Sequence, residues 1–301
     1  EYTDAIGWMV GPENGGMAAM FTMMNNARLG VGTQGIGVAE GAFQHALHYA
    51  QDRKQGKAGG TGSIIEHADV RRMLAEMKAD IFAARAIAMM CACAIDMTTA
   101  TGGDTWRARA AFLTPIAKAF GTDTGIKVAS TGVQVHGGMG FVEETGAAQY
   151  LRDVRVTAIY EGTNGIQAMD LVARKLMDGG EAARLLIEEI QAGAEAARAS
   201  HSDLAKAVWQ AAEDLRETTD WLVAQSDLQE RFSGAVPYLA AFARVLGGHA
   251  HLAAAIHGDA ARTRLATFYI RRLLPEVSGL LAHVREGAGD LLAISPDDLA
   301  A

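Results

Sequence analysis

The sequence predicts a mostly α-helical protein with two successive helical units and a short β segment at its N-terminus. Three observations predict this class. Apolar residues recur at spacings of three and four over long stretches, which is the helical period. Half of the 301 residues are apolar and Ala is abundant, whereas only 6% are aromatic and only five are Pro, which favours helices over sheets. Clusters of Gly separate the stretches. We therefore expect a β segment over 1–14, one helical unit over 15–178 and a second over 179–301.

The N-terminal residues form the expected β segment. "AIGWMVGPENGG" reads as a strand that runs into a Gly-rich turn, with no earlier strand beside which it can pair. A lone strand is unstable in water, and the chain opens on Glu1 rather than on Met. We therefore expect the chain to be a fragment or a processed form of a longer protein.

The first helical unit is expected to contain several helices divided by Gly. Helical spacing occurs over 15–55, 68–101, 114–137 and 145–159, and a further helix follows Glu161 with Thr163 as its N-cap. The run "RVTAIY" directly before Glu161 also reads as the start of a buried strand. The Gly residues in "GVGTQGIG" (30–37) weaken an isolated helix but allow the close approach of a neighbouring helix or a ligand.

The second unit reads as amphipathic helices over 181–200, 202–226, 235–258 and 259–287, divided by Gly, Pro and Ser. None of them carries an obvious cluster of polar side chains suited to catalysis. We therefore look for the chemistry in the first unit.

Charge and composition exclude several classes of function. The formal net charge of −8 argues against nucleic acid as a partner, because phosphate binding needs clustered Lys and Arg. We find no apolar run of membrane-spanning length and no signal peptide, since "AARAIAMMCACAI" is interrupted by Arg85. Cys91 and Cys93 are two apart on a helix, which suits neither a disulfide nor a metal pair. We expect a cytoplasmic protein with both cysteines in its core, without metal and without membrane insertion.

Two helix ends are candidate ligand sites. "QVHGGMGF" (134–141) gathers Gly residues whose backbone can approach a flat or anionic ligand, although a plain helix C-cap explains the same pattern. "QDRKQG" (51–56) puts Arg53 where its planar guanidinium can clamp a phosphate. The alternative is a solvated Arg that complements the helix dipole.

Two further segments place a charged side chain among small or apolar residues. "NNARLGVG" (25–32) contains Arg28, which needs a ligand or, equally, an internal salt bridge as its partner. "YEGT" (160–163) puts Glu161 before a helix N-terminus, where Gly162 leaves room for a substrate. A carboxylate shielded by Tyr160 and an apolar ligand suits a base that removes a weakly acidic C–H proton. A Glu that only interacts with the helix dipole is the alternative.

Taken in order along the chain, these segments resemble the C-terminal half of acyl-CoA dehydrogenases. The matching runs are "ARLGVGTQGIGVAE", "DRKQGK", "QVHGGMGF" and "YLRDVRVTAIYEGTNGIQ". By this resemblance, residues 1–14 are similar to the end of the family's middle β domain and residues 15–178 to its helical-bundle domain. Residues 179–301 resemble the extra C-terminal helical domain of the longer bacterial members.

The resemblance implies an FAD enzyme that oxidises an acyl-CoA thioester to the trans-2-enoyl-CoA. Glu161 matches the catalytic base, which takes the α proton while a hydride leaves the β carbon for N5 of the flavin. In the family, the N–H of the base residue and a flavin hydroxyl hold the thioester carbonyl oxygen. The implied partners are electron-transferring flavoprotein as the electron acceptor and further copies of the chain in a homodimer or homotetramer.

The resemblance also implies which residues bind cofactor and substrate. Those matched to FAD are Arg53 at the pyrophosphate, Gln55 in the same motif, Gln134, Gly137 and Gly138 at the adenosine end, and Thr163 and Gly165 after the base. Those matched to the substrate are Asn25 and Arg28 at the CoA portion and Gly162 at the acyl thioester. In the family, the FAD near the matched Arg often belongs mainly to a neighbouring subunit.

The sequence departs from the family pattern at two positions. Gly56 stands where an aromatic residue is common, and Gly165 replaces a polar residue, so a side-chain bond to FAD from that position is lost. The N-terminal helical domain and most of the β domain of the family have no counterpart in the sequence, and we expect the chain by itself to bind FAD poorly. The alternatives are an acyl-CoA oxidase, which shares the fold and the base, and a non-catalytic helical fragment that serves oligomerisation.

Overall fold

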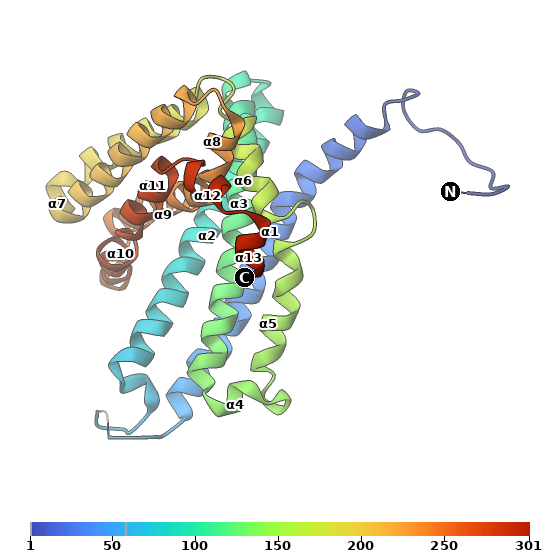
Figure 1. Ribbon diagram of the computed structural model, residues 1–301. Helices are drawn as coiled ribbons and strands as arrows, with labels where there is room; N and C mark the ends of the chain where they lie inside the picture. The colour runs from blue at the N-terminus through green and yellow to red at the C-terminus, as the bar shows by residue number, and fades with distance from the viewer. Residues whose placement is uncertain (1, 58) are drawn as a thin grey trace.

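The structure, a computed structural model, describes residues 2–57 and 59–301 and consists of α-helices in two packed groups (Figure 1). The first group contains α1 (Gly16–Asp52), α2 (Ala68–Thr101), α3 (Asp104–His136), α4 (Gly138–Phe141), α5 (Ala147–Arg155) and α6 (Asn164–Ala173). Short 3-10 helices precede α2 (η1, Ile64–Glu66) and flank α5 (η2, Glu143–Thr145; η3, Val156–Ala158). The second group contains α7 (Glu181–Ala224), α8 (Leu228–Ser233), α9 (Ala235–His257), α10 (Ala260–Arg272), α11 (Glu276–Arg285), α12 (Gly289–Ala293) and α13 (Pro296–Ala300). The predicted mostly helical class is confirmed.

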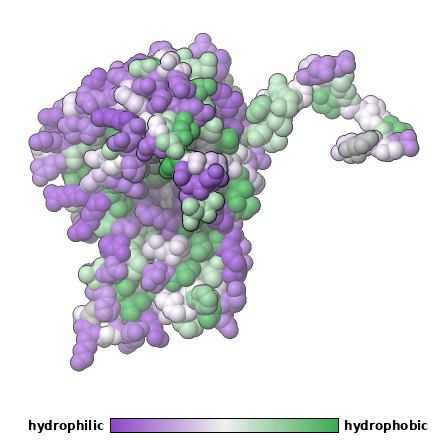
Figure 2. Space-filling view, in the orientation of Figure 1, coloured by the Kyte–Doolittle hydropathy of each residue, from purple (hydrophilic) through white to green (hydrophobic). Residues whose placement is uncertain are grey.

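The expected N-terminal strand does not form within residues 2–15. This segment runs as irregular chain away from the helices, and Figure 2 shows hydrophobic residues along it. Trp8 is 86% exposed and Val10 97% exposed. A strand needs a neighbour to pair its N–H and C=O groups, and the described part of the chain offers none here. The assignment of residues 1–14 as a β segment is therefore corrected, apart from Glu1, which lies outside the described residues.

Helices α1 and α3 cross in direct backbone contact. A Cβ placed on Gly32 would lie 2.6 Å from the carbonyl oxygen of Ala117, and one on Gly35 would lie 2.7 Å from that of Gly121. A Cβ on Gly121 would in turn lie 2.7 Å from the carbonyl oxygen of Gly32. The small residues predicted to permit a close approach therefore accommodate a neighbouring helix.

The ends of the long helices follow the sequence signals, with one exception. Helix α2 spans the predicted residues 68–101 and ends at Gly102, whose left-handed φ of 67° suits a C-cap Gly. Helix α3 begins at Asp104, well before the predicted start at residue 114, and contains Pro115 in its interior. Pro usually occurs in the first turn of a helix, because it has no N–H to donate to the preceding turn. Here the helix continues through Pro115, because the residues around it are buried against neighbouring helices.

The second group shows the expected breaks in a different form. The predicted break near residue 201 is a kink inside α7, where His201 has non-helical angles (φ −140°, ψ 52°).

Of the two cysteines that were expected in the core, Cys91 is buried but Cys93 is exposed. Cys93 lies two residues further along the same helix and so faces another side.

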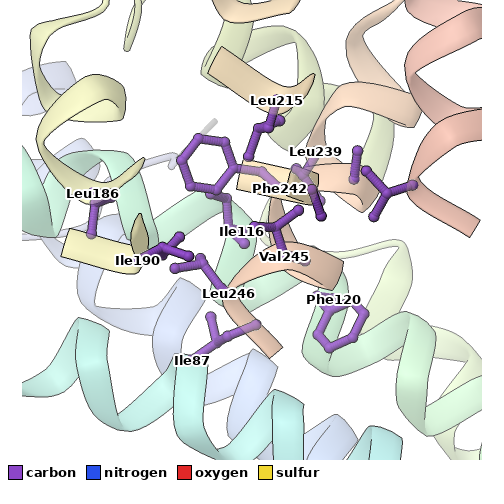
Figure 3. Close-up of a cluster of buried hydrophobic side chains, with 14 of the residues drawn as sticks. Ile87, Ile116, Phe120, Leu186, Ile190, Leu215, Leu239, Phe242, Val245 and Leu246 are labelled. Carbon is purple, nitrogen blue, oxygen red and sulfur yellow. The ribbon is translucent and has the colours of Figure 1, made fainter. Parts of the chain in front are cut away.

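One hydrophobic core joins the two groups of helices. Ile87 of α2, Ile116 of α3, Ile190 of α7 and Phe242 of α9 are at most 1% exposed and belong to a single cluster. Figure 3 shows the side chains from these helices converging on one another. Burial of apolar surface is the main source of folding free energy, so the second group is held to the first by the same force that holds each group together.

Ion pairs reinforce this junction. The guanidinium of Arg244 on α9 bonds the carboxylate of Asp80 on α2 and that of Glu276 on α11, the latter at 2.9 Å. Lys127 of α3 donates to the second oxygen of Asp80 at 2.9 Å. A buried carboxylate needs such partners, and Asp80 finds them on both groups of helices.

Two helices are long and apolar enough, by length and composition, to cross a membrane, namely α2 and α9. The expectation that no apolar run reaches this length was therefore wrong. In α9, 72% of the most apolar stretch is buried inside the protein, against 39% in α2. Core helices of water-soluble proteins satisfy the same criterion, so these two helices are weak evidence for membrane insertion.

Candidate active site

Glu161 lies in a turn between η3 and α6, and a helical segment precedes it. The β-branched run before Glu161 continues α5 as the 3-10 helix Val156–Ala158 and is not a strand. The hydroxyl of buried Thr157 donates to the carbonyl of Val154 at 2.6 Å, a local bond that supports the helical form. The strand-like interpretation was wrong because β-branched residues favour strands only where a neighbouring strand can pair with them.

The turn has an unusual backbone. Glu161 has a φ of +55° and Gly162 a φ of +82°, so two successive residues are left-handed. For Glu this conformation is uncommon and persists only where its surroundings hold it. At Gly162 any other residue would also clash, because a Cβ there would lie 2.8 Å from Nε2 of Gln167. We refer to residues 160–165 as the Glu161 turn.

Side chains of neighbouring helices form hydrogen bonds with the Glu161 turn. The Gln167 amide nitrogen donates to the carbonyl oxygens of Glu161 and Gly162, each at 3.2 Å. The ammonium group of Lys118 donates to the Gly162 carbonyl at 3.0 Å. The Tyr160 hydroxyl bonds the side chain of Gln34 on α1. Within the described residues the N–H of Glu161 has no protein acceptor, so it is available to a ligand.

Thr163 begins α6 as predicted. Its hydroxyl accepts a hydrogen bond from the N–H of Ile166 at 3.3 Å, which confirms the N-cap. Gly165 follows in the first turn of α6 and lines a cleft of about 270 Å³ between α3, α6 and α9.

Lys118 is a functional candidate that the sequence analysis missed. It is fully buried on α3 and also donates to Oδ1 of Asn164 at 2.8 Å. The pKa of Lys118 is lowered to about 8, mainly by burial and to a smaller extent by the charge of Arg28, while the charges of Asp123 and Glu161 oppose the shift. The available signal was a single Lys inside the apolar run "FLTPIAKAFG" (112–121).

Asn164 extends this hydrogen-bonded network to Asp123. Its Nδ2 donates to Oδ1 of Asp123 at 2.7 Å and to the hydroxyl of Thr122 at 2.9 Å. Burial raises the pKa of the Asp123 carboxyl, against the hydrogen bond from Asn164 and the charge of Lys118. The network therefore ties the first residue of α6 to one face of α3.

Arg28 lies under the Glu161 turn and has the internal salt bridge that the sequence analysis left open. This buried Arg of α1 bonds Asp170 of α6 at 3.3 Å and the side chain of Asn25 at 3.2 Å. Its Nη2 would lie 3.9 Å from a Cβ on Gly162. Asn25 is exposed, and both residues border a cleft of about 280 Å³ between α1, α2 and α3. Their predicted role at the CoA portion of a substrate stays a prediction.

The residues matched to the pyrophosphate of FAD lie at the far end of α1. Arg53 and Gln55 are exposed on the loop after this helix. The backbone of the loop is fixed, because Ile64 N donates to Arg53 O at 2.8 Å and Gln55 N donates to Gly62 O at 3.1 Å. The two side chains therefore project from an ordered loop into solvent.

Gln134, Gly137 and Gly138 lie at the end of α3, beside that loop. All three are exposed, and Gly137 adopts φ 59° and ψ −138°, a conformation that requires Gly. A Cβ on Gly137 or Gly138 would meet no atom within 4 Å, so their backbone faces open space. The ring of His136 stacks on Tyr49, with centroids 4.3 Å apart, and so joins the end of α3 to the end of α1.

These residues form one group, which we call the glycine end (Arg53, Gln55, Gln134, Gly137 and Gly138). In Figure 1 the loop after α1 and helix α4 both lie at the lower end of the bundle. The glycine end presents an exposed guanidinium, amides and open Gly backbone, a donor set that fits the pyrophosphate and adenosine of FAD. Within the described residues, no group of three or more His, Cys, Asp or Glu is arranged to hold a metal ion.

The structure does not bring the two predicted groups of residues together. One group lies in and around the Glu161 turn and contains Asn25, Arg28, Glu161, Gly162, Thr163 and Gly165. The glycine end, by contrast, lies at the C-terminal end of α1. From Arg28 to Asp52 helix α1 is continuous, which corresponds to about 36 Å at the helical rise per residue. One short ligand cannot contact both groups within this chain.

Two family models match the chain. The model described as "Acyl-CoA dehydrogenase, C-terminal domain" matches residues 14–177, and the one described as "Acetyl-CoA dehydrogenase C-terminal like" matches residues 186–295. They cover the two groups of helices in turn.

Curated relatives and solved structures agree with these matches. The chain is 44% identical over 258 residues to 3-methylmercaptopropionyl-CoA dehydrogenase of Ruegeria pomeroyi, a match that covers 79% of this chain and 43% of that protein. It is 38% identical over 205 residues to a butyryl-CoA dehydrogenase of Syntrophomonas wolfei, over 63% of this chain and 34% of that protein. The chain thus spans less than half the length of these relatives.

Among solved structures, ACDH-11 of Caenorhabditis elegans in complex with C11-CoA aligns with a TM-score of 0.73 at 22% identity, over 84% of this chain and 44% of that one. Acyl-CoA oxidase 1 of Arabidopsis thaliana aligns with a TM-score of 0.67 at 16% identity, over 94% and 47% of the two chains. At these identities the likeness shows the fold. With the two family models and the sequence relatives, it leads to one conclusion: the chain belongs to the acyl-CoA dehydrogenase family.

Proposed function

We propose that the full-length protein uses FAD to dehydrogenate an acyl-CoA thioester to the trans-2-enoyl-CoA, with Glu161 as the base. The observation that carries this proposal is the Glu161 turn. A carboxylate stands in a strained left-handed turn whose carbonyl groups are bonded from beneath, while its own N–H has no protein acceptor within the described residues. Such strain persists where a group must be held in one place.

Each group of the Glu161 turn has a part in the proposed reaction. The Glu161 carboxylate removes the proton from the carbon α to the thioester. The N–H of the same residue donates to the thioester carbonyl oxygen, where negative charge develops. Gly162 would line the acyl thioester, and its missing side chain leaves room for the Gln167 amide that bonds the turn. FAD, when bound, supplies the acceptor for the hydride that leaves the β carbon.

The glycine end would hold the cofactor at a distance from this turn. Arg53 would contact the pyrophosphate, and Gln134, Gly137 and Gly138 the adenosine end. Since the glycine end lies about 36 Å along α1 from Arg28, we propose that the FAD at the glycine end reaches its own reaction site on a neighbouring copy of the chain. A homodimer or homotetramer is therefore part of the proposal, and electron-transferring flavoprotein is the proposed acceptor.

For the substrate we propose a short acyl-CoA, with a thioether-bearing propionyl thioester tested first. The names of the two sequence relatives support this choice. An acyl-CoA oxidase is the second candidate, because the oxidase fold also matches the chain. Reoxidation of the substrate-reduced enzyme by oxygen separates the two, since a dehydrogenase needs an added acceptor for rapid turnover.

The proposal is tested by replacing Glu161 with Gln in the full-length protein. Glu161→Gln should retain FAD and bind acyl-CoA, yet show no anaerobic loss of flavin absorbance on addition of substrate. Glu181→Gln is the matched control, because Glu181 is an exposed Glu in the first turn of α7 and exemplifies the purely dipolar alternative. Loss of absorbance in Glu161→Gln at the rate of the wild type would exclude Glu161 as the base.

A further inference from the structure

Lys118 is buried in a place where a Lys is unusual. Its side chain is 0% exposed, and Lys is almost never fully buried without a partner. The surrounding run of α3 is apolar, with Phe112, Leu113, Ile116 and Phe120 in the core. Desolvation of an ammonium group is costly, and a Met or Leu would fill a similar volume without that cost. The position therefore needs an explanation beyond packing.

The bonds of the ammonium group lead to the Glu161 turn. Nζ donates to the carbonyl oxygen of Gly162 at 3.0 Å and to Oδ1 of Asn164 at 2.8 Å. Both acceptors lie within three residues of Glu161. Hydrogen bonds from a charged donor are among the strongest in proteins, so Lys118 holds the turn more firmly than a neutral donor would.

The left-handed backbone at Glu161 requires such an external hold. An isolated Glu prefers negative φ, and the peptide groups around Gly162 would relax toward that region if their carbonyls were free. Gln167 of α6 restrains the carbonyls of both Glu161 and Gly162, and Lys118 of α3 adds a second, shorter bond to that of Gly162. Lys118 therefore ties this carbonyl to a different helix through a charged donor.

We propose that Lys118 is the positioning residue for Glu161: through the Gly162 carbonyl and Asn164, it holds the carboxylate and the N–H of Glu161 in register with the thioester. This inference rests on the proposed function. Lys118 touches no reacting atom in it and acts through the backbone of the turn. A misplacement of reacting groups by about 1 Å can lower a rate by about 100-fold, so the expected effect is on the chemical step.

The expected kinetic signature is a split between kcat and KM. Lys118 touches no reacting atom in the proposal, so its loss should slow the chemical step and leave KM nearly unchanged.

The test compares Lys118→Met with Lys127→Met in the full-length protein. Lys127 lies on the same helix and also bonds a carboxylate, but its partner is Asp80 and not the Glu161 turn. We expect Lys118→Met to lower kcat by about 100-fold and to change KM by less than about threefold. Lys127→Met should leave both unchanged. Unchanged kcat in Lys118→Met, or an equal loss in Lys127→Met, overturns the proposal.

Hydrogen exchange tests the same proposal without relying on catalysis. The amide hydrogens of Ile166 and Gln167, which bond the hydroxyl and the carbonyl of Thr163, should exchange at least ~10-fold faster in Lys118→Met, because exchange requires local opening, and should not change in Lys127→Met. Failure of the wild type to dehydrogenate any acyl-CoA would refute the proposed function. Equal exchange rates in Lys118→Met and Lys127→Met would refute the role of Lys118, whatever the activity of the wild type. If Lys118→Met does not fold, Asn164→Ala takes its place, and unchanged kcat and exchange in it overturn the proposal.

Discussion

The Glu161 turn and the glycine end both contain predicted site residues, but buried contacts hold the first group and the second is exposed to solvent. At the Glu161 turn, buried side chains of α3 and α6 bond the backbone, and buried Arg28 of α1 pairs with Asp170 of α6 close to it. At the glycine end, Arg53, Gln134 and Gly137 are exposed, and only the backbone beneath them is fixed. The chain therefore supplies by itself the hydrogen bonds that hold the backbone of the proposed base, whereas the groups matched to FAD face outward.

This difference follows from the cost of burying polar groups. A buried donor or acceptor must find its partner within the protein, so Lys118, Asn164 and Asp123 are arranged before any ligand arrives. An exposed Arg or Gly backbone has water as its partner and contributes little to folding. Substitutions should therefore affect stability and chemistry at the Glu161 turn, but mainly ligand retention at the glycine end.

The largest expected effect is at the crossing of α1 and α3 that supports the Glu161 turn. A Cβ on Gly35 would lie 2.7 Å from both Gly121 O and the Cα of Thr122, which are backbone atoms that cannot move aside. Gly35→Val should lower the free energy of unfolding by about 3 kcal/mol or more, measured by urea unfolding. Gly37→Val is the control, because a Cβ on Gly37 meets no atom within 4 Å. An equal loss in both variants would mean that the crossing is not the sensitive contact.

A smaller effect is expected at the N-cap of α6. Thr163→Ala removes the acceptor for the N–H of Ile166 and should lower the free energy of unfolding by about 1 kcal/mol. Thr163→Ser keeps the hydroxyl and should recover most of that loss in the same unfolding experiment. If the Ala and Ser variants were equally destabilised, the methyl group of Thr163 and not its hydroxyl would support the turn.

The smallest effect on stability is expected at the glycine end. Arg53→Ala should change the free energy of unfolding by no more than about 0.5 kcal/mol, since the side chain is exposed. It should nevertheless weaken FAD retention more than acyl-CoA affinity, measured as flavin content after gel filtration. Arg107→Ala, an exposed Arg near the opposite end of α3, is the control. Flavin content equal to that of the wild type would remove Arg53 from the cofactor site.

Local signals in the sequence were sufficient for much of the architecture. The bounds of α2, the N-cap at Thr163 and the close approach at the Gly residues of α1 were all predicted. Each depends on the spacing of apolar residues or on a capping side chain within a few positions. The family motifs placed Glu161 by the same kind of short-range pattern.

Where prediction failed, the outcome depended on whether a long-range partner was present. The β-branched run before Glu161 became a 3-10 helix, and α3 continued through the residues before Pro115. The expected N-terminal strand lacked a partner within the described residues. Propensity is a weak prior in each case, because tertiary packing decides which conformation is stabilised.

By itself the sequence determined that the chain is helical, where most of its helices lie and which carboxylate stands at the turn before α6. Only the tertiary structure decided that Lys118 and Arg28 support that turn, that the two groups of helices share one core, and that the glycine end lies far from Glu161. The physical reason is that the residues in contact are far apart along the chain. Lys118 and Gly162 are 44 residues apart. They form a hydrogen bond because the α1–α3 crossing and the burial of α6 bring the Lys118 ammonium group to the Gly162 carbonyl.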